Sequence, residues 1–145
     1  MLRNRSILGL VAFAAVLAGA CGQAPVTEPD EAGPAIVEPI DGTALSRVTL
    51  TDSAAERVGI ETVAVASGTG GRLMVPNATV LYDANGQAWV YTNPEGHVFV
   101  RAPITIVGTQ GDDSILSEGP AVETQVVTVG VPELYGTELG VGDPE

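Results

Sequence analysis

Short runs of alternating apolar and polar residues follow one another along most of this chain. After residue 72 they recur at intervals of about ten residues, a spacing typical of a β meander, sandwich or barrel. Turn-forming Asn, Asp, Pro and Gly separate several of them, at 83–86, 93–96 and 110–113. The expected strands span residues 73–75, 79–82, 88–92, 97–102, 104–107, 114–116 and 125–129.

An earlier pair of strands is expected to open the fold. Val48 and Leu50 alternate with polar neighbours, as they would in a half-buried strand. A second strand is expected over residues 60–65, with less regular alternation. A glycine-rich break at 67–72 then separates this region from the later series.

One short helix is expected between these two strands. Thr51 or Ser53 can cap its first turn, and Ser53 and Glu56 have the spacing of a capping box. Gly59 stands where a left-handed C-cap residue is needed. Residues 132–138 have room for one further helical turn. The whole pattern predicts a mostly β fold, a small antiparallel meander or barrel-like domain with one short helix.

The first 20 residues have the pattern of an export signal. Arg3 and Arg5 precede an apolar run over residues 7–20, which ends in small residues before Cys21. A membrane-spanning helix needs about 20 apolar residues, so a permanent transmembrane segment is the weaker alternative. We expect a signal peptide over residues 1–20.

Cys21 is the only cysteine, and it is the expected membrane anchor. The sequence LAGAC at 17–21 resembles the lipobox of bacterial lipoproteins, although Ala18 stands where the lipobox usually has leucine. In that family the cysteine is lipidated and becomes the first residue. A lone exported cysteine is otherwise paired between molecules or a free thiol. Ala18 and Ala20 also form an A-x-A site, which would allow soluble secretion.

An acidic, proline-rich tether is expected from residue 21 to residue 44. Residues 23–43 include four prolines, five carboxylates and no basic residue. This composition is typical of extended, solvated chain. The folded domain is then expected over residues 45–142, outside the cytoplasm and held to the cell envelope by a covalent lipid on Cys21.

The charge of the chain disfavours nucleic acid as a partner. The formal net charge is −12, and from Cys21 onward four arginines stand against 18 carboxylates. Such a surface repels a phosphate backbone, and no cluster of basic residues follows the N-terminal segment.

An ordered series of motifs carries a family resemblance. VPNATV, WVY, a strand that ends in Arg101, LSEGP and VVTVG follow one another within residues 75–136, after VTLTDSAAERVGIETVAV at 48–65. This order resembles the C-terminal, membrane-proximal region of periplasmic adaptor subunits, or membrane fusion proteins, of efflux systems. Only residues 66–72 stand where the lipoyl-like domain, helical hairpin and β-barrel of an adaptor would interrupt the sequence. The resemblance thus implies a membrane-proximal domain that stands alone.

A function follows from the resemblance as an expectation. It implies a non-catalytic, lipid-anchored envelope protein that acts through protein contact, as an accessory or assembly component of an efflux or transport complex. Its partners would be the membrane, through Cys21, and an efflux transporter or adaptor protein. The alternative is an independent lipoprotein that binds a small molecule or a cation.

Catalysis, a specific metal site and any cofactor other than the lipid are not expected. His97 is the only histidine, and no G-x-S-x-G or comparable nucleophile motif accompanies it. No two carboxylates have the recognisable pairing that separates an acid from a base. After the signal peptide, only Met74 and His97 offer thioether or imidazole ligands.

The stretch AWVYTNPEGHVFV at 88–100 contains the only Trp and the only His of the chain. Alternation places Trp89 and Tyr91 on one face of a hairpin strand, while Phe99 and Arg101 share a face of the return strand. Cross-strand packing is the simpler interpretation of this cluster. The functional interpretation is a contact with a protein partner, formed by Trp89, Tyr91, Phe99 and Arg101.

Overall fold

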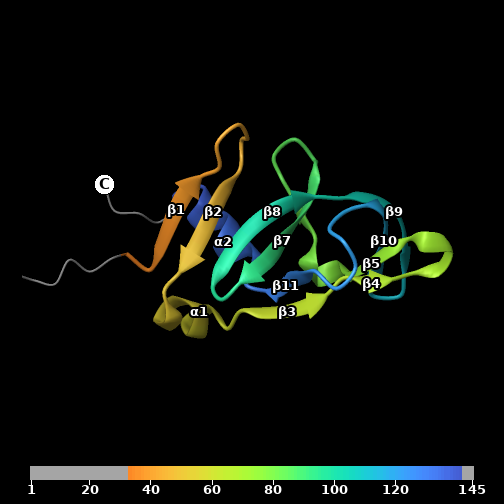
Figure 1. Ribbon diagram of the computed structural model, residues 1–145, viewed down its shortest axis with the longest axis horizontal. Coiled ribbons are helices and arrows are strands. Elements are labelled where there is room, and N and C mark those ends of the chain that lie inside the picture. The colour runs from red at the N-terminus through yellow and green to blue at the C-terminus, as the bar shows by residue number, and fades with distance from the viewer. Residues whose placement is uncertain (1–32, 142–145) are drawn as a thin grey trace, which may run out of the picture. The chain divides into compact units, whose positions relative to one another are not determined.

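The computed structural model describes residues 33–141 (Figure 1). The expected signal peptide, Cys21 and the first part of the tether lie outside the described residues. The predicted mostly β, antiparallel character is confirmed, with two α-helices rather than one. In chain order the elements are β1 Ala35–Pro39, β2 Ser46–Leu50, α1 Asp52–Val58, β3 Glu61–Ala64, β4 Ala66–Ser67, η1 Thr69–Gly71, β5 Leu73–Pro76, η2 Asn77–Thr79, β6 Leu81–Tyr82, β7 Ala88–Glu95, β8 Val98–Pro103, β9 Thr105–Gln110, β10 Asp113–Glu118, β11 Gln125–Val129 and α2 Val131–Glu138, where η1 and η2 are 3₁₀ turns.

The strands form two antiparallel sheets. The first sheet has the order β1-β2-β8-β7-β11-β3, with β6 added to β7, and the second has the order β4-β5-β10-β9. In a simple meander each strand pairs with the next one along the chain. The first sheet departs from this, because β8 also pairs with β2 and β7 also pairs with β11. It has two ends, at β1 and β3, so the first sheet is open within residues 33–141.

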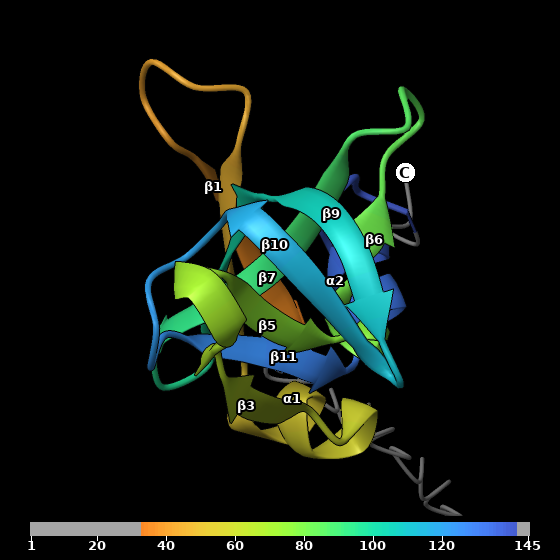
Figure 2. The ribbon, with the colours of Figure 1, turned by 90° about the vertical axis from the view of Figure 1, so that its right-hand side faces the viewer.

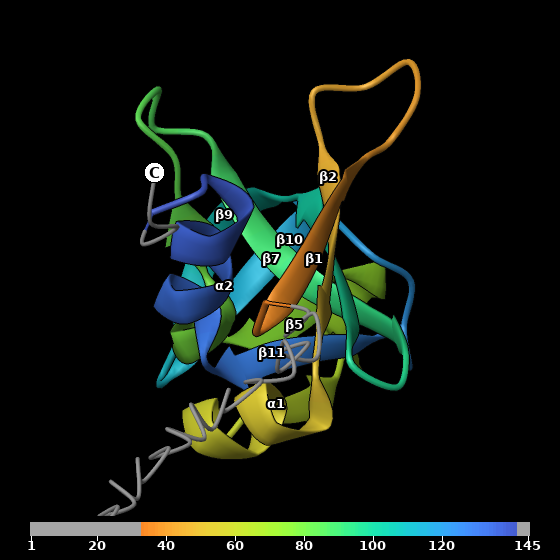
Figure 3. The ribbon, with the colours of Figure 1, turned by 90° about the vertical axis from the view of Figure 1, so that its left-hand side faces the viewer.

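The central strands β7 and β11 of the first sheet are buried on both faces, and this divides the core in two. Tyr91 of β7 faces the helices, while its neighbour Val90 faces the second sheet; Val127 and Val126 of β11 divide in the same way. Figure 2 shows the second sheet in front of β7 and β11, and Figure 3 shows α1 and α2 on the other side. The helix-side core consists of Val48, Leu50, Ala54, Ala55, Tyr91, Phe99, Val127, Val131 and Leu134. The sheet-side core consists of Val65, Val75, Val90, Ile104, Leu116 and Val126.

Helix α1 begins and ends as local sequence predicts. Thr51 is its N-cap, and its Oγ1 accepts a hydrogen bond from the backbone N–H of Ala54 at 3.3 Å. Of the two predicted caps, Thr51 is therefore the one used. Gly59 ends the helix in the left-handed conformation, with φ of 70°. The buried pair Ala54 and Ala55 lets the helix approach the sheet closely.

Helix α2 is a complete helix of eight residues where the sequence suggested at most a single turn. It starts after Gly130, which has φ of 97°, and it buries Val131 and Leu134 against the sheet. Tertiary burial, rather than helix propensity, thus stabilises a segment that contains both proline and glycine. No helix in the described part of the chain is long and apolar enough to cross a membrane.

The expected boundary between tether and domain, at residues 44 and 45, differs from the structure. Strand β1 lies inside the segment assigned to the tether and pairs with β2 over its whole length, from Ala35 opposite Leu50 to Pro39 opposite Ser46. The prolines and carboxylates of residues 21–44 indicated a tether, although residues 35–37 are three consecutive apolar residues. The strand forms because β2 satisfies its backbone groups along one side.

Gly130 provides a test of how tightly α2 must approach α1. A Cβ atom there would lie 2.2 Å from Cδ1 of Ile60 and 2.9 Å from Cγ1 of Val58. We expect Gly130→Ala to lower the free energy of unfolding by about 2–4 kcal/mol in urea denaturation, from backbone strain and overpacking together. The matched control is Gly42→Ala, where φ is also positive but no atom lies within 4 Å. It should lose only about 1 kcal/mol, and equal losses would contradict the close contact.

Candidate functional site

The four residues predicted to form a partner contact all lie on the β7–β8 hairpin, and their side chains are buried or partly buried. Tyr91 is 0% exposed and Phe99 is 1% exposed. Trp89 and Arg101 are partly buried. Tyr91 and Phe99 therefore present no surface to a partner, and the hairpin acts as a packing element between helices and second sheet.

A buried ion pair joins this hairpin to α2. The guanidinium of Arg101 donates from Nη2 to Oε1 of Glu138 at 3.0 Å, and its Nε lies 2.7 Å from Oε2. The Nε contact has the distance of an ion pair without the alignment of a hydrogen bond. The side chains are only 10% and 3% exposed. Because water reaches neither group freely, each charge depends on the other.

Two further groups donate hydrogen bonds to the Glu138 carboxylate. The hydroxyl of Tyr91 donates to Oε2, and the backbone N–H of Ser46 donates to Oε1 at 3.4 Å. Glu138 thus links β7, β8 and the start of β2 to the last turn of α2. Burial raises the pKa of Tyr91 well above its ordinary value of 10.0, and the hydrogen bond to the negatively charged Glu138 raises it further.

Two aromatic rings lie against the same guanidinium. The Cζ atom of Arg101 is 4.8 Å from the ring centre of Trp89 and 5.3 Å from that of Tyr135. Both distances permit cation–π attraction, which is stronger where water is excluded. This contact accounts for the aromatic concentration that the sequence displayed around Trp89, without a ligand.

Asp83 accepts a hydrogen bond from the indole N–H of Trp89. Its Oδ2 accepts from the indole Nε1 at 3.1 Å, and its Oδ1 accepts from the backbone N–H groups of Asn85 and Gln87 at 2.8 and 2.9 Å. Partial burial acts to raise the pKa of Asp83. The hydrogen bonds from Gln87, Trp89 and Asn85 outweigh it and lower the pKa below the usual value.

Sequence reasoning missed Glu138 and Asp83 as members of this cluster. The signal for Glu138 was its place in the i, i+3, i+4, i+7 series 131, 134, 135 and 138, which puts a carboxylate on the apolar face of α2. A carboxylate on such a face needs a cation. Arg101 was the only arginine on the neighbouring hairpin.

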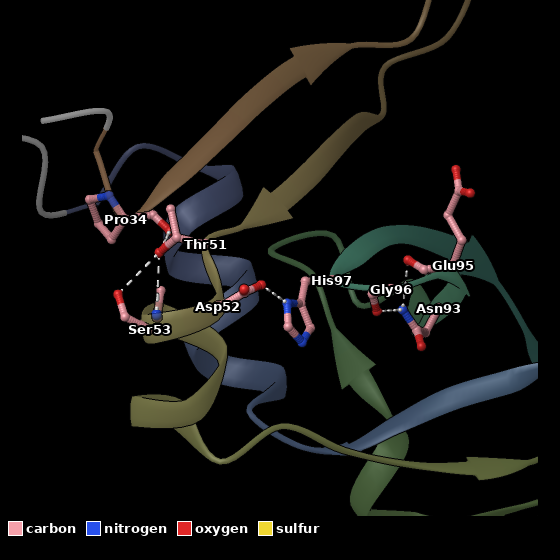
Figure 4. A network of polar contacts seen from close by, with 9 residues as sticks. Pro34, Thr51, Asp52, Ser53, Asn93, Glu95, Gly96 and His97 are labelled. Carbon is pink, nitrogen blue, oxygen red and sulfur yellow. Dashed lines mark hydrogen bonds and ion pairs between the residues drawn. The ribbon is translucent and has the colours of Figure 1, made fainter. Parts of the chain in front are cut away.

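His97 lies apart from the cluster, at the turn of the same hairpin (Figure 4). Its Nδ1 is 3.1 Å from Oδ1 of Asp52, at the start of α1; the Asp52 side chain is almost fully accessible to water and that of His97 is partly accessible. Within residues 33–141 no three His, Cys, Asp or Glu side chains are placed to hold a metal ion. The arrangement can bind by hydrogen bonds and charge.

Two adjacent exposed apolar residues lie elsewhere, on the edge strand β1. Ile36 is 54% exposed and Val37 is 40% exposed. Within residues 33–141, β1 pairs with β2 on one side only, so no described strand pairs with the backbone N–H and C=O groups on its other side. Strand β9 also ends a sheet, but its exposed large apolar residue is Val107 alone.

The buried ion pair predicts strong coupling between its two members. We expect Arg101→Met and Glu138→Met each to lower the free energy of unfolding by about 3 kcal/mol, because each leaves an unpaired buried charge. The double variant should lose at least about 2 kcal/mol less than the sum of the single losses. The measurement is urea denaturation of all four proteins. Additive losses would show that the two side chains act independently.

Tyr91 predicts a distinct response to alkaline pH. Since its pKa is raised in the folded state, its contribution to stability is complete below about pH 10 and is lost as pH rises towards the folded-state value. We expect Tyr91→Phe to show the same tyrosinate absorbance change as the unsubstituted protein up to about pH 11, until unfolding exposes the hydroxyl. A smaller change in the variant at that pH, with the fold intact, would contradict the shielding of Tyr91.

Comparisons with known proteins were made at three levels. No family model, curated protein or solved structure matches this chain. The adaptor resemblance therefore rests on the ordered sequence motifs alone.

Proposed function

We propose that this chain is an exported envelope protein, anchored by a lipid on Cys21, that works without catalysis through protein contact in an efflux or transport complex. The observation that carries the contact role is the free edge of β1, with its adjacent exposed residues Ile36 and Val37. The export signal and lipobox-like sequence support the location. The adaptor-like order of motifs supports the kind of partner.

An exposed edge strand is suited to receive an extended segment of another protein. Its unpaired backbone groups supply hydrogen bonds, and alternate side chains supply selectivity. Glu38 and Pro39 at the end of β1 restrict such pairing, because charge and proline both oppose indiscriminate edge association. The edge is thus selective rather than generally adhesive.

A groove beside the edge enlarges this surface. It has a volume of about 360 Å³ and lies between the start of β1, α1 and α2. Ala35, Leu50 and Ala54 contribute apolar surface to it, while Arg57 and Glu133 contribute opposite charges. A strand added to β1 would place alternate side chains on the side of the sheet where this groove lies.

Site-specific photo-crosslinking in cells tests the contact. A photoreactive residue at Val37 should capture a transporter or adaptor subunit, because the side chain stands at the free edge. Val122 is the matched control, since it is also a valine, is 41% exposed and lies outside any strand. The same crosslink should weaken in a Cys21→Ala background, where the chain loses its lipid.

Three results would contradict the proposal. If Val37 captured no subunit of a transport complex, the proposed partner would be wrong. If Val122 captured the same protein equally well, the proposed contact through β1 would be wrong. If the Cys21→Ala variant kept both the crosslink and its association with the envelope, the proposed lipid anchor would be wrong.

A further inference from the structure

A second cleft lies on the other flank of α1, away from the groove beside β1. It has a volume of about 340 Å³ and separates α1 and the start of β3 from the turn between β7 and β8. Polar and apolar side chains both line it. The polar contribution comes mainly from Glu56, Asn93 and His97, and the apolar one from Ala55, Ile60 and Phe99.

Asn93 is oriented by the turn that contains it. Its Nδ2 donates to the carbonyl oxygens of Gly96 at 2.8 Å and Val98 at 2.9 Å, with a longer contact to Glu95 at 3.4 Å (Figure 4). Carbonyl oxygens only accept, so the amide nitrogen must face them. The Oδ1 atom therefore points away from these carbonyls and remains available as an acceptor.

His97 is oriented by Asp52 in the same manner. A carboxylate only accepts, so the Nδ1 atom facing it at 3.1 Å must carry the proton. In the neutral imidazole the other nitrogen, Nε2, is then a hydrogen-bond acceptor. Figure 4 shows the ring between α1 and the turn.

Glu56 adds a negative charge on the helix side of the cleft. It forms neither an ion pair nor a side-chain hydrogen bond with another of the described residues, whereas the neighbouring Arg57 lines the groove on the opposite flank of α1. Among the described residues that line it, the cleft thus presents acceptors on Glu56, Asn93 and His97 beside the hydroxyl of Thr62, and neither Lys nor Arg. Its electrostatic character favours a positively charged donor.

We infer that this cleft binds a small primary ammonium ion with an apolar body. An ammonium group has three N–H donors and a positive charge, which complement the acceptors of Glu56, Asn93 and His97 and the negative charge of Glu56. The apolar body would lie against Ile60 and Phe99, where burial of carbon surface adds affinity. This site is separate from the β1 edge, so either can fail without the other.

Nuclear magnetic resonance of the full chain tests the inference, because His97 is the only histidine and its ring signals need no assignment. Titration with phenethylammonium should shift these signals with saturation. Phenethyl alcohol, which has the same ring but no charge, and hydrocinnamate, which carries a negative charge, should bind at least about fivefold more weakly.

A pair of charge-neutralising variants locates the site. Glu56→Gln should weaken phenethylammonium binding by about fivefold. Glu133→Gln is the matched control, since it removes an exposed helical carboxylate beside the other groove, and it should leave binding unchanged. Circular dichroism checks that both variants are folded. Absence of saturation, equal binding of the alcohol, or equal effects of the two variants would each overturn the inference.

Discussion

The ion pair between Arg101 and Glu138 holds together elements that the chain order keeps apart. It joins β8 to α2, and through Glu138 it also reaches β7 at Tyr91 and β2 at Ser46. Helix α2 contributes Val131 and Leu134 to the helix-side core that also contains Phe99, and Glu138 reaches this core through its hydrogen bond from Tyr91. Burying both charges is costly in free energy, and the hydrogen bonds from Tyr91 and Ser46 and the aromatic rings beside the guanidinium offset that cost.

Burial of the central strands β7 and β11 on both faces restricts where recognition can occur. A strand such as β7, with Tyr91 and Val90 both inaccessible, has no free face for a partner. Recognition must then use the periphery of the domain: an edge strand, a turn or a helix flank. The hairpin that looked most like a binding site in the sequence contributes only its turn, at Asn93 and His97.

Local chemistry explains what the sequence predicted well. Alternation and turn residues predicted every strand from β5 to β11 to within a few residues, and Gly59 ends α1 as expected, because these signals act over a few neighbouring residues. Strand β1 and helix α2 were missed or shortened because their stability is non-local. β1 depends on pairing with β2, and α2 on burying Val131 and Leu134. The role of Glu138 was hidden for the same reason, since its partner lies 37 residues away.

The burial of Arg101 in an ion pair also affects the charge balance of the surface. Only four arginines follow Cys21, and one of them is removed from the surface by pairing with Glu138. The pair removes one charge of each sign, so three arginines remain against 17 carboxylates from Cys21 onward. A domain of this kind attracts hydrogen-bond donors and cations, and it repels anions of every size. Both proposed binding surfaces share this excess, through the acceptors around His97 and the Glu38 side chain at the end of β1. A partner or ligand of this domain should therefore bring the positive charge that the domain itself lacks.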